Sequence, residues 1–259
     1  MAYAPIEGGQ LFYRTDGKPD LPVLVLSNSL GTDHSMWQAQ LPAFSEQFRL
    51  VRYDSRGHGA STVTPGEYTI ERLGRDVLSL LGHLKIETAF YCGLSLGGLV
   101  GQWLGLHAPE RFHKVVLSST AAKIGTPEVW DGRIESIRTG GVAAIIPPLL
   151  ERWFTAGFRQ REPGTVERIR KMVESTPLDG YLGACAAIRD VDFRGELSRI
   201  RMKTLVISGT HDTSTPPEGG RFLARQIPGA KYVEFDAAHL LNVELPRQFS
   251  EEVLRFLNA

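Results

Sequence analysis

The chain has 259 residues, of which 42% are hydrophobic and 22% are charged, as is typical of a globular protein with a full core. Its 29 Lys and Arg residues balance its 29 Asp and Glu residues, which argues against a nucleic-acid or anionic-membrane partner, because either would need a positive surface. The two cysteines, Cys92 and Cys185, are too few for a disulfide framework and lack metal-ligand spacing.

The N-terminal sequence lacks the basic start and apolar run of a signal peptide. No apolar run approaches the ~18 residues that a membrane-spanning helix needs. We therefore expect a soluble cytoplasmic protein that acts on a small molecule. Both a monomer and a homo-oligomer are compatible with the sequence.

Short apolar segments alternate with helical patterns along most of the chain. Residues 8–17 predict an antiparallel edge hairpin. The predicted buried strands, rich in Val, Leu or Ile, lie at 21–28, 48–54, 88–93, 113–119, 202–209 and 230–236. Helical periodicity predicts helices at 71–84, 217–227 and 246–259. This alternation indicates an α/β fold with a mostly parallel, doubly wound sheet.

The alternation stops between residues 123 and 190, where no strand-like run occurs. Helical, glycine-punctuated patterns at 130–154 and 165–176 predict a helical cap inserted into the sheet. We expect residues 1–122 and 191–259 to form the α/β core, and 123–190 the cap. Basic and acidic residues nearly balance in the cap, so any charge selectivity there must come from one or two placed residues.

The segment Gly93-Leu94-Ser95-Leu96-Gly97 fits the pattern G-x-S-x-G. It lies between a predicted strand and a helical pattern that ends at Ala108-Pro109, which is the context this motif requires. There the chain turns sharply and exposes the serine hydroxyl, while the glycines remove side chains that would collide. We predict that Ser95 is a nucleophile; the alternative is a purely structural turn.

A serine hydroxyl needs a base to take its proton and a third group to orient that base. The order expected for this architecture is serine, acid, histidine. His239, between the last strand and the last helix, is the predicted base. Asp212, which follows the preceding strand, is the predicted acid, with a helix-capping role as its alternative. Asp236 is a rival acid close to His239 in sequence, and His211 would point away from Asp212.

An oxyanion hole would combine two backbone N–H groups. The first belongs to Leu96, which follows the nucleophile. The second comes from an early strand–helix loop, where Leu30 is our first choice and Ser29 its alternative.

The segment 54–61, DSRGHGAS, is the other conspicuous motif. Arg56 and His58 are residue types that carry chemistry, but Gly57 and Gly59 mark a tight turn after a strand. We therefore predict a structural role, in which Arg56 ties neighbouring loops together.

The motifs DSRGHGAS, GLSLGG, GTHD and AAHLLNVELP occur in the order typical of the α/β-hydrolase superfamily, which the chain resembles over nearly its whole length. Within it, the chain is similar to the 3-oxoadipate enol-lactonases of the β-ketoadipate pathway. The resemblance rests on SNSLGTDHSMW, RYDSRGHGAS, VLSSTAAKIG and the W-x-x-R motif at Trp130–Arg133. Asn28-Ser29 replaces the superfamily's usual His-Gly, and Ala238 its usual Gly; neither change removes a catalytic atom.

This resemblance implies hydrolysis of a five-membered enol-lactone that bears a carboxymethyl arm, without a metal or other cofactor. Ser95 would attack the lactone carbonyl and form an acyl-enzyme. The enolate leaving group would stay attached and ketonise, and water activated by His239 would release 3-oxoadipate. Direct attack by water is the alternative.

The carboxylate arm needs a cationic or hydrogen-bonding partner, because an unpaired buried charge is costly. The available cap arginines are Arg133, Arg138, Arg159 and Arg161. Arg133 is our first choice, since it lies three residues from Trp130 on the same helical face; its alternative is an exposed helix charge. Trp130 and Trp153 either line the pocket or fill the core of the cap.

Other functions share these residues. A general carboxylesterase, a carbon–carbon bond hydrolase of the same pathway class and a cofactor-free perhydrolase all use this triad. Haloalkane dehalogenation is disfavoured, because Ser95 stands where that chemistry needs a carboxylate. A non-catalytic small-molecule receptor is the alternative from another class, and the intact set of Ser95, Asp212 and His239 argues against it.

Overall fold

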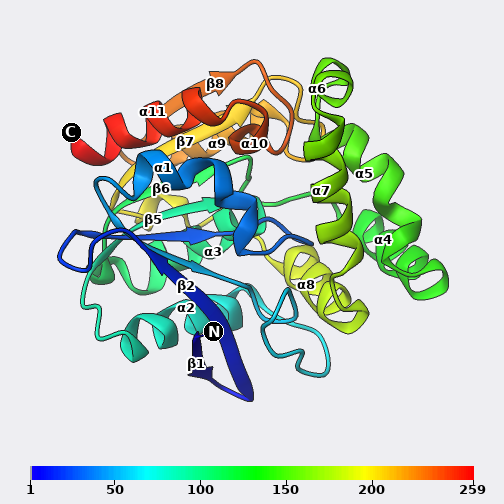
Figure 1. Cartoon of the computed structure of the whole chain (residues 1–259), viewed down its shortest axis with the longest axis horizontal. Helices are drawn as coiled ribbons and strands as arrows, with labels where there is room; N and C mark the ends of the chain where they lie inside the picture. Colours follow the sequence, from blue (N-terminus) through cyan, green and yellow to red (C-terminus); the bar gives the residue numbers. More distant parts are fainter. Residues whose placement is uncertain (1) are drawn as a thin grey trace.

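A single eight-stranded sheet runs through the computed structural model, which describes residues 2–259 (Figure 1). Its strand order is β1-β2-β4-β3-β5-β6-β7-β8. β1 and β2 pair antiparallel, as do β2 and β4, and all other pairs are parallel. The strands are β1 (Ala2–Ile6), β2 (Gly9–Asp16), β3 (Val23–Ser27), β4 (Arg49–Tyr53), β5 (Ala89–Leu94), β6 (Phe112–Ser118), β7 (Lys203–Gly209) and β8 (Lys231–Phe235). The predicted fold class is confirmed.

The edge hairpin lies closer to the N-terminus than the sequence predicted. Residues 8–17 form only its second strand, β2, whereas the first strand is β1. The turn between them includes Gly8, whose φ is 76°. Pro5 within β1 concealed this strand, because proline is disfavoured in strands except at an edge, where β1 lies.

Helices cover both faces of the sheet (Figure 1). α2 (Ile70–His83) packs against α3 (Leu96–His107), and α11 (Pro246–Asn258) packs against α1 on the opposite face. Leu73, Val77 and Leu80 give α2 a buried apolar face at helical spacing. The other elements of the core are η1 (His34–Gln40), α1 (Leu41–Phe44), η2 (Pro109–Arg111), η4 (Leu197–Arg199), α9 (Pro217–Gln226) and α10 (Leu241–Glu244).

Between β6 and β7 the chain forms a group of helices that gathers at one end of the sheet (Figure 1). They are α4 (Pro127–Gly140), η3 (Val142–Ile145), α5 (Ile146–Trp153), α6 (Ala156–Arg161), α7 (Pro163–Glu174) and α8 (Leu178–Asp190). α4 packs on α8 and α5 on α7, and the buried side chains between them continue into the main core. No helix within residues 2–259 combines the length and apolarity needed to cross a membrane.

Arg56 is fully buried and connects three segments. Its Nε and Nη2 donate to the carboxylate of Asp76 on α2 at 2.8 and 2.5 Å. Its Nη1 donates to the carbonyl of Glu7 in the β1–β2 turn at 2.9 Å and to Thr64 Oγ1 at 3.3 Å. Burial raises the pKa of Asp76, and the Arg56 guanidinium opposes this rise. These contacts confirm the predicted structural role of Arg56.

Replacing Arg56 by methionine removes one partner of a buried ion pair and leaves Asp76 uncompensated. We expect Arg56→Met to lower the free energy of unfolding by about 3–5 kcal/mol, measured by urea denaturation. Arg75→Met is the matched control, since Arg75 and Glu71 form an exposed pair on the same helix. That variant should lose less than about 1 kcal/mol. Equal losses in the two variants would contradict the assigned role.

Candidate active site

Ser95 occupies a strained turn between β5 and α3. Its φ of 57° and ψ of −109° are a backbone conformation that residues other than glycine rarely adopt. Its N–H donates to the carbonyl of Ser118 at 2.9 Å, and its carbonyl accepts the hydroxyl of Thr120 at 3.0 Å. These bonds to the end of β6 and to the chain just after it hold the turn and leave the Ser95 side chain on the wall of a cavity.

The glycines on either side of Ser95 supply space. A Cβ atom on Gly93 would lie 2.2 Å from the carbonyl oxygen of Gly97. One on Gly97 would lie 2.4 Å from the carbonyl oxygen of Ser27 at the end of β3. Neither glycine has a positive φ, so the strain of the turn falls on the serine itself.

Asp212 and His239 follow the neighbouring parallel strands β7 and β8, and therefore meet at the carboxyl edge of the sheet. His239 Nδ1 lies 2.8 Å from Asp212 Oδ2. Both side chains are almost completely buried. An ionised Asp212 therefore fixes the ring orientation of His239 and favours a proton on Nδ1, which leaves Nε2 to accept one.

Hydrogen bonds keep Asp212 in its ionised form. Its Oδ1 accepts the N–H groups of Ser214 and Thr215 at 2.8 and 2.9 Å, and its Oδ2 accepts the hydroxyl of Thr215 at 2.7 Å. Burial alone raises the pKa of this carboxyl. The interaction with His239 and these hydrogen bonds outweigh burial, so the net effect is a lowered pKa of Asp212.

The alternative acid Asp236 and the neighbouring histidine His211 form a pair outside the cavity that contains Ser95. His211 Nε2 is 2.7 Å from Asp236 Oδ1, and the two side chains are 58% and 89% exposed. Neither residue lines the cavity that contains Ser95. The geometry therefore brings together the predicted set of Ser95, Asp212 and His239.

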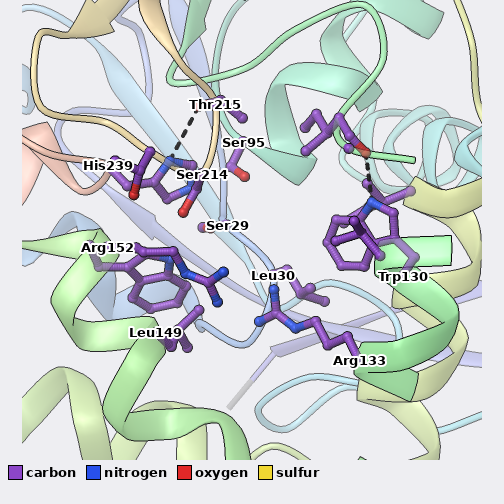
Figure 2. Close-up of a pocket in the computed structure, with 16 residues that line it drawn as sticks. Ser29, Leu30, Ser95, Trp130, Arg133, Leu149, Arg152, Ser214, Thr215 and His239 are labelled. Carbon is purple, nitrogen blue, oxygen red and sulfur yellow. Dashed lines mark hydrogen bonds between the residues drawn. The ribbon is translucent and has the colours of Figure 1, made fainter. Parts of the chain in front are cut away.

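The cavity has a volume of about 180 Å³ and is lined by both Ser95 and His239 (Figure 2). Within residues 2–259, Ser95 Oγ makes no hydrogen bond to His239. Such bonds are often long before substrate is bound. The shared cavity wall gives a small ligand access to both groups.

Two backbone amides near Ser95 are available to a ligand. In the described part of the chain, the N–H groups of Leu30 and Leu96 donate no hydrogen bond. The N–H of Ser29, the alternative considered from sequence, is directed at Met36 Sδ at 3.4 Å. Leu96 begins α3, so its amide has no acceptor within the helix. The geometry thus favours Leu30 over Ser29.

His58 supports this loop, a role that the sequence did not reveal. Its Nε2 accepts the N–H of Gly31 at 3.0 Å, and its Nδ1 lies 3.1 Å from the carbonyl of Arg56. Burial lowers the pKa of His58, which favours the neutral ring that this acceptor role requires. The DSRGHGAS segment therefore stabilises the loop that carries Leu30.

Trp130 and Trp153 both line the cavity, and both are largely buried in the hydrophobic core. The Trp153 ring stacks on the His239 imidazole, with centroids 6.1 Å apart. The Trp130 indole N–H donates to the carbonyl of Ile124 at 2.6 Å. The Arg133 guanidinium lies 5.3 Å from the Trp130 ring centre, as their spacing predicted.

Arg133 lines the cavity, whereas the other three predicted arginines do not. Arg152 also lines it, although the sequence patterns did not predict this. Arg152 precedes Trp153 at the end of α5. Its position next to a cavity-lining tryptophan was the only signal in the sequence that could have pointed to it.

Glu244 joins the segment between α5 and α6 to the loop that carries His239. Its carboxylate accepts the hydroxyl of Thr155 and the N–H of Ala238, the latter at 3.0 Å. On the other side of His239, the N–H of Leu240 donates to the carbonyl of Trp153 at 3.1 Å. These bonds flank His239 on both sides and fix the loop against α5 and α6.

Within residues 2–259, one group has metal-ligand spacing: Asp33, His34 and Asp54. Asp54 Oδ1 already lies 2.7 Å from His34 Nδ1 and accepts the His34 N–H at 2.8 Å. Asp54 Oδ2 accepts the N–H of Ala60 at 2.9 Å. None of the three residues lines the Ser95 cavity. The group therefore connects neighbouring loops through hydrogen bonds.

A family model described as alpha/beta hydrolase fold matches residues 22–246. The chain belongs to the α/β-hydrolase fold family. This hydrolase is 42% identical to 3-oxoadipate enol-lactonase 2 of Acinetobacter baylyi, over 94% of its own chain and 91% of that relative. It is 38% identical to 3-oxoadipate enol-lactonase 1 of the same organism, over 98% and 95% of the two chains.

A solved structure, the enol-lactonase from Burkholderia xenovorans, superposes on this hydrolase with a TM-score of 0.98. The two are 47% identical, and the match covers the whole of both chains. The predicted hydrolase class and the resemblance to enol-lactonases are confirmed.

The lowered pKa of Asp212 gives this hydrolase a specific pH dependence of stability. The contribution of Asp212 is complete above the ordinary carboxyl pKa of about 4 and is lost as the pH falls through the lowered folded value. The difference in unfolding free energy between wild type and Asp212→Asn should therefore shrink below about pH 4. Urea denaturation at a series of pH values measures it.

Asp236→Asn is the control, because Asp236 pairs with His211 on the surface. That variant should differ from wild type by no more than about 1 kcal/mol at any pH. A difference for Asp212→Asn that stays constant across the acid range would contradict the assigned ionisation.

Proposed function

We propose that this protein is a serine hydrolase that opens the ring of 3-oxoadipate enol-lactone to give 3-oxoadipate in aromatic-compound catabolism. The observation that carries the proposal is that the strained Ser95 and His239 line one cavity, with His239 held from behind by the buried Asp212. The enol-lactonase names of relatives that match nearly the whole chain support the substrate.

In the proposed reaction, Ser95 Oγ attacks the lactone carbonyl while His239 Nε2 takes the hydroxyl proton. The free amides of Leu30 and Leu96 stabilise the oxyanion. The ring C–O bond then breaks, and the enolate oxygen receives the proton held by His239. The enol so formed becomes a ketone, and the acyl group remains on Ser95.

Water completes the cycle. His239 takes a proton from the water that attacks the acyl-enzyme, and then returns a proton to Ser95 Oγ as the ester bond breaks. Asp212 remains ionised throughout and stabilises the imidazolium, in keeping with its lowered pKa. The balance is one lactone plus one water to 3-oxoadipate, and these residues require no cofactor.

The cap supplies the substrate pocket in this proposal. We treat residues 123–190 as a cap on a core of residues 1–122 and 191–259. Arg133, held by Tyr181, pairs with the carboxymethyl arm. Trp130 and Trp153 form walls against the ring, since both line the cavity.

The cellular location and the partners of the protein are part of the same proposal. We place a cytoplasmic enzyme with a small-molecule substrate in this proposal, and the balanced net charge argues against a nucleic-acid or anionic-membrane partner. The rival function is a non-catalytic small-molecule receptor. The intact set of Ser95, Asp212 and His239 disfavours it, because binding alone needs neither a nucleophile nor an oriented base.

The deciding experiment is a spectrophotometric assay of the purified protein with freshly generated 3-oxoadipate enol-lactone. The proposal requires a kcat/KM well above that for simple aryl esters. Faster turnover of aryl esters would indicate a general carboxylesterase, and cleavage of a linear dienoic acid a carbon–carbon bond hydrolase.

Ser95→Ala removes the nucleophile and leaves the backbone turn in place. We expect kcat to fall by about 10³-fold or more, with unchanged circular dichroism. Retained turnover in the folded variant would rule out Ser95 as nucleophile and favour another mechanism.

Arg133→Met removes one cation from the pocket. We expect it mainly to raise the KM for the carboxylate-bearing lactone, by about tenfold or more, because a charge-assisted pair is lost. Steady-state kinetics with neutral lactones provide the comparison. If neutral lactones are affected to the same extent, Arg133 acts only in packing.

A further inference from the structure

Two arginines reach the same cavity from different cap helices. Arg133 extends from α4 and Arg152 from α5, and both line the cavity that contains Ser95. Figure 2 shows their guanidinium groups pointing toward each other across the space beside Leu30 and Leu149. Like charges in such proximity repel, so this arrangement needs a physical reason.

No counter-charge within the protein explains it. In residues 2–259 neither arginine takes part in an ion pair, although many other arginines do. Arg133 donates only to the hydroxyl of Tyr181, and Arg152 donates to no protein acceptor. The Nε atoms of both side chains are buried without a partner.

The surroundings of Arg152 also disfavour its positive charge. Burial and the charge of Arg133 both lower the pKa of Arg152, while Tyr181 opposes them. A half-buried guanidinium that faces a second one loses solvation and gains repulsion. A bound anion would relieve both effects. The cavity is therefore short of negative charge in the unliganded protein.

We propose that Arg152 and Arg133 together form a two-arginine clamp for one carboxylate of the ligand. A carboxylate has two oxygens and about four acceptor sites, enough for two guanidinium forks. The clamp deepens the proposed function and rests on it in placing the lactone carbonyl at Ser95. The ligand class is then a small lactone or oxo acid whose free carboxylate lies a fixed distance from the reacting carbonyl.

The clamp also excludes neutral ligands. An ester or amide in place of the carboxylate leaves both guanidinium charges uncompensated, and this cost adds to the lost hydrogen bonds. One arginine would favour an anion only by attraction. Two facing arginines add repulsion in its absence, so selectivity between charged and neutral arms depends on Arg152.

The kinetic test measures that selectivity. The ratio of kcat/KM for 3-oxoadipate enol-lactone to kcat/KM for its methyl ester is compared between wild type and Arg152→Met. We expect the ratio to fall by about tenfold to a hundredfold in the variant. Arg138→Met, at an exposed arginine on α4, is the matched control for removing one positive charge from the cap, and should keep the wild-type ratio.

Arg152→Lys separates charge from geometry. Lysine keeps the positive charge but lacks the planar fork, so it should restore only part of the ratio. An unchanged ratio in Arg152→Met, or an equal fall in Arg138→Met, overturns the clamp.

A binding measurement keeps this test independent of turnover. Adipate, a six-carbon dicarboxylate, should raise the midpoint of thermal unfolding of wild type and Arg138→Met but not of Arg152→Met. Dimethyl adipate should raise none of the three. An equal rise in Arg152→Met, or no rise in wild type, overturns the clamp. If wild type fails to hydrolyse the lactone but shows the adipate pattern, the proposed reaction is wrong and the clamp stands.

Discussion

The positive φ of Ser95 is the constraint on which the rest of the site depends. A serine in this conformation is disfavoured by itself and persists only where its neighbours over-determine it. Here β5 is hydrogen-bonded in the centre of the sheet, and α3 lies so close to the end of β3 that Gly97 has no room for a Cβ atom. Packing against the sheet thus holds Ser95 in the strained conformation that exposes its hydroxyl. The flanking glycines provide the space that this conformation needs.

Several donor groups of the site are left unsatisfied by the folded chain. The amides of Leu30 and Leu96 donate to nothing within residues 2–259, and the guanidiniums of Arg133 and Arg152 face each other without a carboxylate. The buried guanidinium of Arg56, by contrast, is paired with the carboxylate of Asp76. Unsatisfied donors in one cavity are costly in the free protein, and an anionic ligand with a developing oxyanion would satisfy them.

Hydrogen bonds hold the loop of His239 between the sheet edge and the helices that follow β6. Glu244 and the carbonyl of Trp153 bind the backbone on either side of His239, while Asp212 holds its ring from behind. The ring is therefore oriented both from the sheet and from these helices. A change in these helices can reach the proposed base through these bonds as well as through the pocket walls.

Local patterns were sufficient for much of this structure. Short apolar runs rich in Val, Leu or Ile predicted the central strands, and the strand–G-x-S-x-G–helix context pointed to Ser95. Asp212 and His239 followed from their places after late strands, because parallel strands deliver their carboxyl ends to one edge. The first edge strand was missed because Pro5 interrupts its pattern.

The sequence by itself determined the fold class, the turn at Ser95 and the order of the polar residues at the sheet edge. These features depend on short-range patterns and chain order. Only the tertiary structure decided which groups share the cavity. It separated Arg133 and Arg152 from Arg138, Arg159 and Arg161, and Leu30 from Ser29. The sequence does not distinguish these arginines. Whether an arginine on a helix has a partner depends on residues of other helices, and those come close only in the folded chain.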